Sequence, residues 1–135
     1  MSLCPPRDAS SNINVPEAQR DPNEWNEKIY HEESDKALDL LHEKLEAYVE
    51  DLGIPESDVE YSQGVLTVCL GKLGTFVINK QTPNKQIWMS SPVSGPFRYD
   101  WNSGLWVYHR DGRMLLQQLE TELEGLTGKP IKLLS

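Results

Sequence analysis

Cysteine is scarce in this chain, and long apolar runs are absent. The two cysteines, Cys4 and Cys69, lie far apart and form no C-x-x-C pair, which argues against a disulfide framework and against a zinc site. Because Cys69 falls within an alternating apolar stretch, we expect it to be a small packing residue. No apolar run approaches the ~18 residues that a membrane-spanning helix needs. With 38% hydrophobic and 25% charged residues, the composition is that of an ordinary globular domain.

Positive charge is also in short supply. The net charge is −8, which argues against nucleic acid or an anionic membrane as a partner. The imbalance is local, because residues 21–60 hold 14 acidic residues against three lysines and so carry −11. The rest of the chain has ten basic and seven acidic residues and carries +3. One part of the protein is therefore strongly negative and the remainder faintly positive.

The N-terminal region lacks recognisable targeting features. It has neither an apolar secretory core nor the Arg-rich, acid-poor stretch of an organellar presequence. Two interpretations stay open: a cytosolic protein, or a chain that begins after a removed presequence. Residues 1–20 contain three prolines and no periodicity, so we expect a disordered tail. The remaining residues, 21–135, suit a single domain.

Two segments have helical periodicity. Asp21-Pro22-Asn23-Glu24 predicts a helix start, with Asn26 as a competing cap, and Gly53-Ile54-Pro55 predicts its end. Its apolar positions recur at three- and four-residue spacing: Leu38, Leu41, Leu45, Tyr48, Val49 and Leu52. A second helix is predicted over residues 112–126, and the apolar residues 131–134 are expected to pack back on the helices.

Between the helices the apolar period changes to two, which is typical of strands. The strand candidates are 58–62, 65–70, 74–80, 86–91, 96–101 and 105–109. Their short connections predict antiparallel pairing. Both helices need to bury an apolar stripe, whereas one face of an antiparallel sheet can stay wet. The predicted fold class is therefore α+β: a two-layer αβ sandwich with both helices on one face of an antiparallel sheet of about six strands.

The alternation places a polar group of side chains on the uncovered sheet face. With Phe76 and Ile78 directed at the helices, Asn79 points away from them, and Gln86 and Trp88 do the same on the next strand. Arg98 alternates in the same way. A tryptophan among amides and hydroxyls is typical of a protein-binding anchor, and the face offers no nucleophile with a nearby base. The alternative is that Trp88 lies flat against its neighbours and only shields the sheet.

The first predicted helix carries an acidic stripe that lies within an arc of about 80° at ~100° per residue. Its members are Glu32, Asp35, Asp39, Glu43, Glu46 and Glu50. The five like-charge contacts cost the helix roughly 1–2.5 kcal/mol, and Glu56, Asp58 and Glu60 extend the negative region. Hard, oxygen-seeking cations or a basic protein surface are the expected partners; a merely solubilising charge run is the alternative. A di-iron bundle is rejected, because Asp39-x-x-His42 would need partners from four helices.

Several motifs together resemble the frataxin family of the eukaryotic type. They are Asn79-Lys80-Gln81-Thr82-Pro83-Asn84-Lys85-Gln86-Ile87-Trp88, Ser90-Ser91-Pro92, Ser94-Gly95-Pro96 and Arg98-Tyr99-Asp100-Trp101. The likeness spans about residues 26–127. The resemblance implies a mitochondrial matrix protein with an αβ sandwich. It also implies weak binding of ferrous and ferric iron and docking on a cysteine desulfurase with its iron–sulfur scaffold protein, where docking promotes persulfide transfer, iron entry and cluster assembly.

Carried over by position, the resemblance assigns two sets of residues. The implied iron ridge consists of Asp35, Asp39, Glu43, Glu46, Glu50, Glu56 and Asp58. The implied partner-binding residues are Asn79, Gln81, Asn84, Gln86, Trp88 and Arg98. Ferrochelatase is a further implied partner, which would connect the chain to heme biosynthesis. A monomer is expected, with an iron-dependent oligomer as an alternative.

Two functions follow as hypotheses. The first is a non-enzymatic, iron-binding activator of iron–sulfur cluster assembly, with no catalytic residues of its own. The alternative is a ferroxidase and iron chaperone or store that oxidises ferrous iron on the acidic ridge, an activity also attributed to this family. The activator hypothesis makes Trp88 and Asn79 indispensable, whereas the ferroxidase hypothesis makes the carboxylates indispensable and Trp88 dispensable.

Overall fold

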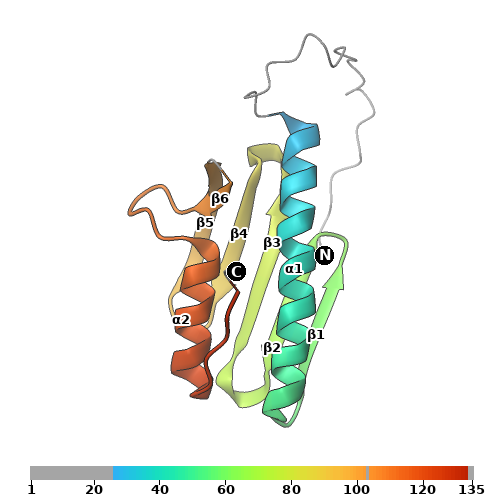
Figure 1. Cartoon of the computed structure of the whole chain (residues 1–135), viewed down its shortest axis with the longest axis vertical. Helices are drawn as coiled ribbons and strands as arrows, with labels where there is room; N and C mark the ends of the chain where they lie inside the picture. The colour runs from blue at the N-terminus through green and yellow to red at the C-terminus, as the bar shows by residue number, and fades with distance from the viewer. Residues whose placement is uncertain (1–25, 103, 134–135) are drawn as a thin grey trace.

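Two helices lie side by side on one face of a six-stranded antiparallel sheet (Figure 1). The structure, a computed structural model, describes residues 26–102 and 104–133. The helices are α1 (Glu27–Leu52) and α2 (Leu115–Thr127), and the strands are β1 (Ser57–Ser62), β2 (Val65–Leu70), β3 (Thr75–Gln81), β4 (Gln86–Ser91), β5 (Gly95–Asn102) and β6 (Leu105–Val107). The strand order β1-β2-β3-β4-β5-β6 is a simple meander. The predicted fold class is confirmed.

The helix α1 begins at the competing cap. Asn26 has an extended backbone and its side-chain oxygen accepts a hydrogen bond from the Ile29 N–H at 3.0 Å, as an N-cap does. The predicted start at Asp21 and the predicted tail over 1–20 lie outside the described residues. Gly53 ends the helix with a φ of 65°, a left-handed conformation that glycine adopts without a steric penalty.

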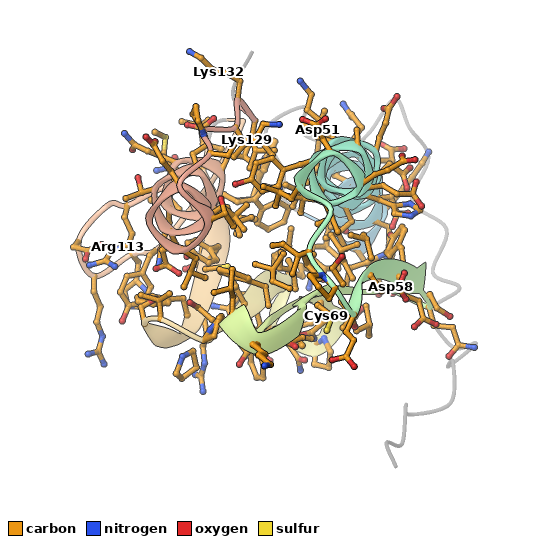
Figure 2. All side chains as sticks on the ribbon, turned by 90° about the horizontal axis from the view of Figure 1, so that it is seen from below. Asp51, Asp58, Cys69, Arg113, Lys129 and Lys132 are labelled. Carbon is orange, nitrogen blue, oxygen red and sulfur yellow. The ribbon has the colours of Figure 1, made fainter. Side chains whose placement is uncertain are left out.

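The core lies between the helices and the sheet, and the side chains fill this layer in Figure 2. The leucine stripe of α1, namely Leu38, Leu41 and Leu45, is completely buried against inward residues of the strands. Phe76, Ile78 and the other predicted inward positions are also buried, because alternate residues of a strand point to the same face.

The segment after α2 returns between the two helices (Figure 1). Leu133 is buried, and its N–H donates to the Glu120 carboxylate at 2.6 Å. On α1, the buried Tyr48 hydroxyl donates to the Lys129 carbonyl at 2.7 Å. The expectation that the C-terminal residues pack on the helices is confirmed for Leu133, while Leu134 lies outside the described residues.

Two predicted boundaries differ near the end of the sheet. The strand β6 stops at Val107 rather than at 109, and α2 starts at Leu115 rather than at 112. Met114 has an extended backbone and forms a β-bridge with Val107, and the Tyr108 N–H donates to the Arg113 carbonyl at 2.9 Å. The bridge and this hydrogen bond close residues 108–114 into a turn. Neither helical nor strand periodicity predicts such a turn.

The packing role expected for Cys69 is wrong. Val68 and Leu70 fill the core, so the alternation directs Cys69 to the uncovered face, where it is half-exposed opposite Asp58 (Figure 2). Its thiol lies 3.5 Å from the Glu56 carbonyl. Among residues 26–102 and 104–133, no helix is both long and apolar enough to cross a bilayer.

Candidate functional site

The predicted outward row is present on the uncovered face of the sheet. Asn79 on β3 pairs with Trp88 on β4, which pairs with Arg98 on β5. Directly paired residues of an antiparallel sheet place their side chains next to each other on the same face. Val65 of β2 pairs with Asn79 and is 39% exposed, so it extends the row with an apolar member. We call the row Val65–Asn79–Trp88–Arg98 the sheet-face row.

Trp88 is held between polar neighbours and is half-buried. The Arg98 guanidinium carbon lies 4.7 Å from the centroid of its ring, a distance suited to a cation–π contact. The indole N–H donates to Gln86 Oε1 at 2.7 Å, and Gln86 Nε2 donates to Asp100 Oδ1 at 2.9 Å. The indole thus points outward, as predicted, but its orientation is fixed by a chain of contacts. Sequence reasoning missed Asp100, although its two-residue spacing from Arg98 places it on this face.

The remaining predicted partner-binding residues lie at the end of the β3–β4 hairpin. Gln81 pairs with Gln86 across the two strands, whereas Asn84 is exposed in the 3₁₀ turn η4 (Thr82–Asn84). The side-chain amide of Asn79 donates to the Lys80 carbonyl at 3.1 Å. The structure therefore brings five of the six predicted residues onto adjacent strands and leaves Asn84 at the turn beyond them.

The seven predicted ridge carboxylates are all exposed. They do not form one site, because Asp35 and Glu50 are separated by about 22 Å along α1 at ~1.5 Å per residue. Four of them, Glu43, Glu46, Glu50 and Asp58, line a shallow groove of about 440 Å³ between α1 and the edge strand β1. Glu56 lies in the preceding turn with a φ of 62° and does not line this groove. We call the seven residues the acidic ridge.

The chemistry of the acidic ridge suits loosely held hard cations. Carboxylate oxygens are the donors that such cations prefer, and exposed donors leave room for water ligands. In the part of the chain that the structure describes, no three His, Cys, Asp or Glu side chains converge as a metal-binding group. Of the histidines on α1, His42 Nε2 lies 3.7 Å from the Glu46 carboxylate. The geometry therefore fits a row of weak sites better than a cage.

Asp35 differs from the other ridge carboxylates because it has a lysine partner from the sheet. Lys80 Nζ lies 2.7 Å from Asp35 Oδ1, and the Lys80 side chain is only 14% exposed. The sequence reasoning missed this pair because the two residues are 45 positions apart. A signal was present: Lys80 alternates with Ile78 and so points toward the helices.

The negative charge of the acidic ridge reaches the tyrosines beneath α1. Burial raises the pKa of Tyr61, and the charges of Asp35 and Asp39 raise it further. Burial raises the pKa of Tyr30 to about 12, with Asp35 as a minor cause. The Tyr30 hydroxyl donates to the Gln86 carbonyl at 2.8 Å. Tyr30 thus joins the first turn of α1 to the hairpin that carries the sheet-face row.

The chain matches a known family over most of its length. The frataxin-like domain matches residues 23–129. The chain is 49% identical over 109 residues to mitochondrial frataxin of Arabidopsis thaliana, covering 79% of this chain and 58% of that protein. It is 48% identical over 100 residues to the mitochondrial frataxin homolog of Saccharomyces cerevisiae, covering 74% of this chain and 58% of the yeast protein. The chain thus spans a little over half the length of these relatives, which are named mitochondrial, in agreement with the expected location.

Solved structures give the same result. A crystal structure of trimeric frataxin from Saccharomyces cerevisiae, complexed with ferrous iron, superposes with a TM-score of 0.65 at 44% identity and covers 85% of this chain and 100% of that one. A second yeast frataxin structure gives 0.69 at 41% identity, with 86% and 97% covered. The fold, the motifs and the extent of these matches lead to one conclusion: this chain belongs to the frataxin family.

Proposed function

We propose that this protein is an iron-binding activator of mitochondrial iron–sulfur cluster assembly. Its sheet-face row docks on a complex of cysteine desulfurase and scaffold protein and promotes persulfide transfer and iron entry. The observation that carries this proposal is the fixed setting of Trp88, with Arg98 4.7 Å from the ring and Gln86 2.7 Å from the indole nitrogen. An aromatic residue whose orientation is fixed before binding loses little conformational entropy on docking.

The acidic ridge has a second, electrostatic role in this proposal. Its exposed carboxylates attract hard cations such as ferrous iron and also complement a basic protein surface. In this function iron is cargo rather than a resident cofactor. The ferrous complex of the yeast relative supports this part of the proposal.

Oxidation of ferrous iron on the ridge is the second candidate function. The groove between α1 and β1 supports it, since Glu43, Glu46, Glu50 and Asp58 lie there together. These carboxylates are exposed, so an ion bound there would leave quickly into solvent and would not be held for oxidation. We therefore give the activator function precedence, and ferrochelatase remains a proposed additional partner.

The experiment measures sulfide production by a eukaryotic desulfurase–scaffold complex. It compares the wild type with Trp88→Ala and with the double variant Asp39→Asn/Glu43→Gln. The matched control is Val93→Ala, which truncates an apolar side chain that is 56% exposed in the β4–β5 turn. Circular dichroism establishes that each variant is folded.

The activator function predicts that wild type and Val93→Ala stimulate sulfide production equally and that Trp88→Ala does not stimulate it. The double variant then reports what the acidic ridge adds. Absence of stimulation by the wild type with a competent complex would contradict the activator function. Oxidation of ferrous iron, followed as ferric iron formed in air, would then be tested on the same variants.

A further inference from the structure

Lys80 places a positive charge beside Asp35, the first residue of the acidic ridge. It lies on the helix-facing side of β3, and its ammonium contacts the Asp35 carboxylate at 2.7 Å. The two side chains differ in exposure, 14% for Lys80 and 52% for Asp35. The stem of the lysine is thus largely covered by protein, while the hydrogen bond between its ammonium and the Asp35 carboxylate is exposed.

The position of Lys80 is fixed by several neighbours. The backbone N–H of Lys80 donates to the Gly64 carbonyl at 2.9 Å, and the backbone carbonyl of Lys80 accepts from the Asn79 side chain at 3.1 Å. A β-carbon added to Gly64 would lie 3.4 Å from the lysine Cδ, so the stem passes close to the β1–β2 turn. The ammonium lies 5.9 Å from the centroid of the Tyr30 ring. These contacts hold the stem in place and direct the ammonium toward the Asp35 carboxylate.

The next two ridge residues along α1, Asp39 and Glu43, differ from Asp35 in their partners. Within the described residues, Asp39 and Glu43 form no ion pair with a basic side chain. The lysine nearest to Asp39 in sequence, Lys36, pairs with Glu33 at 3.4 Å. A cation that binds Asp39 or Glu43 therefore displaces only water, whereas a cation that binds Asp35 competes with a lysine at hydrogen-bond distance.

We propose that Lys80 removes Asp35 from the cation-binding set, so that the working ridge begins at Asp39. This inference rests on the proposed binding of cations to the acidic ridge, and it changes the ligand set that family resemblance assigns. A cation that does claim Asp35 must displace Lys80, which lies between Asn79 and Gln81 on the hairpin of the proposed docking surface. Because coupling between two sites is reciprocal, occupation of Asp35 and the position of the hairpin are linked.

The test compares two aspartates that carry the same charge on the same helix face. Mn²⁺ is the probe, since it prefers oxygen ligands, does not oxidise during the titration and broadens the NMR signals of nearby amides. Affinity is measured by calorimetry for the wild type, Asp35→Asn and Asp39→Asn. Lys80→Met then removes the competing cation, and Lys36→Met is the matched control, because it removes one positive charge from α1 without touching Asp35.

The expected result is that Asp39→Asn weakens Mn²⁺ binding and Asp35→Asn changes it little. Lys80→Met should strengthen binding about fivefold, at the low end of the usual range for coupled sites, and Lys36→Met should do so less. In the Lys80→Met background, Asp35→Asn should weaken Mn²⁺ binding as much as Asp39→Asn does. The amides of residues 33–37 should broaden more strongly in that background than in the wild type, and those of Gln81 and Gln86 should shift there.

Equal losses from Asp35→Asn and Asp39→Asn in the wild type would overturn the inference. So would equal gains from Lys80→Met and Lys36→Met, because both would then act only through net charge. Absence of any Mn²⁺ broadening along α1 in the wild type would instead overturn the cation-binding part of the proposed function. Failure of the inference alone would leave ridge binding intact with Asp35 as an ordinary ligand.

Discussion

The acidic ridge and the sheet-face row represent opposite ways of building a surface. Along the ridge, like charges follow one another at three- and four-residue spacing, and Asp39 and Glu43 form no ion pair within the described residues. Across the sheet face, neighbouring side chains hold one another: Trp88 donates to Gln86, which donates to Asp100. The ridge lowers the stability of its helix, whereas the sheet face is ordered by its own contacts.

This difference indicates what each surface is suited to bind. Exposed carboxylates that repel one another gain from any cation that neutralises them, and they place few geometric demands on it. A fixed indole beside a guanidinium presents one shape and suits one partner surface. We therefore expect a single substitution to weaken binding by the ridge less than it weakens binding by the sheet face.

The largest expected effect is on docking through Trp88. Trp88→Ala should weaken binding to the desulfurase–scaffold complex by about 2–4 kcal/mol, the range of a hot-spot residue. Arg98→Ala should cost less, and the double variant should lose little more than Trp88→Ala, because the guanidinium lies against the indole. Biolayer interferometry on the three variants measures this coupling. Strictly additive losses would mean that Arg98 contacts the partner independently of Trp88.

The next effect concerns Tyr30, which joins α1 to the hairpin. Its pKa is raised by burial to about 12 in the folded protein, from about 10 in the unfolded chain. Because the folded protein favours the neutral form of Tyr30, the contribution of this residue to the free energy of unfolding is complete below about pH 10. That contribution, about 2–3 kcal/mol, is lost as the pH rises through about 12. Urea unfolding at about pH 8 and about pH 11.5 measures the loss.

Tyr30→Phe removes that titration, so the stability of the variant should fall less steeply above pH 10 than that of the wild type. At neutral pH it should cost about 1 kcal/mol, the usual value of one hydrogen bond, here the bond to the Gln86 carbonyl. Burial also raises the pKa of Tyr99, so the variant should retain part of the alkaline loss. Identical pH profiles for the two proteins would show that Tyr30 does not titrate in this range.

A smaller effect is expected from adding a charge to the sheet face. Gln86→Glu keeps the acceptor for Trp88 but replaces the donor to Asp100 by a second carboxylate. The like charges should destabilise the fold by about 1 kcal/mol, and acid should relieve the loss by protonating one of them. Thermal unfolding at neutral and acidic pH measures this, with the exposed Gln117→Glu on α2 as control. An equal loss in the control would contradict a specific role for Gln86.

The smallest effect, and the one of opposite sign, is expected on the ridge. Asp39→Asn/Glu43→Gln removes like-charge contacts and should stabilise the protein by about 0.5–1 kcal/mol, an increase that salt should reduce. Asp51→Asn is the control, since Asp51 forms an ion pair with Lys129 and its loss should not stabilise (Figure 2). Destabilisation of the double variant would contradict the view that the ridge opposes folding.

Much of the fold and of the site could be predicted, because both depend on periodicity. The leucine spacing of α1 and the alternation of β3 and β4 indicate which side chains face the core, and they place Trp88 and Asn79 on the correct face. The same alternation directs Cys69 outward and Lys80 toward α1. The bounds of β6 and α2 could not be predicted, since they depend on a bridge between Val107 and Met114.

The sequence by itself determined the two helices, the six strands, the polar row and the acidic stripe, because each is a local repeat that any regular element of that period must display. Only the tertiary structure decided which charges are partnered and which aromatic ring is held. The pair of Asp35 with Lys80 and the contact of Arg98 with Trp88 depend on strand register and on the placement of α1 over the sheet. Those are distances between residues remote in sequence, and no local pattern encodes them.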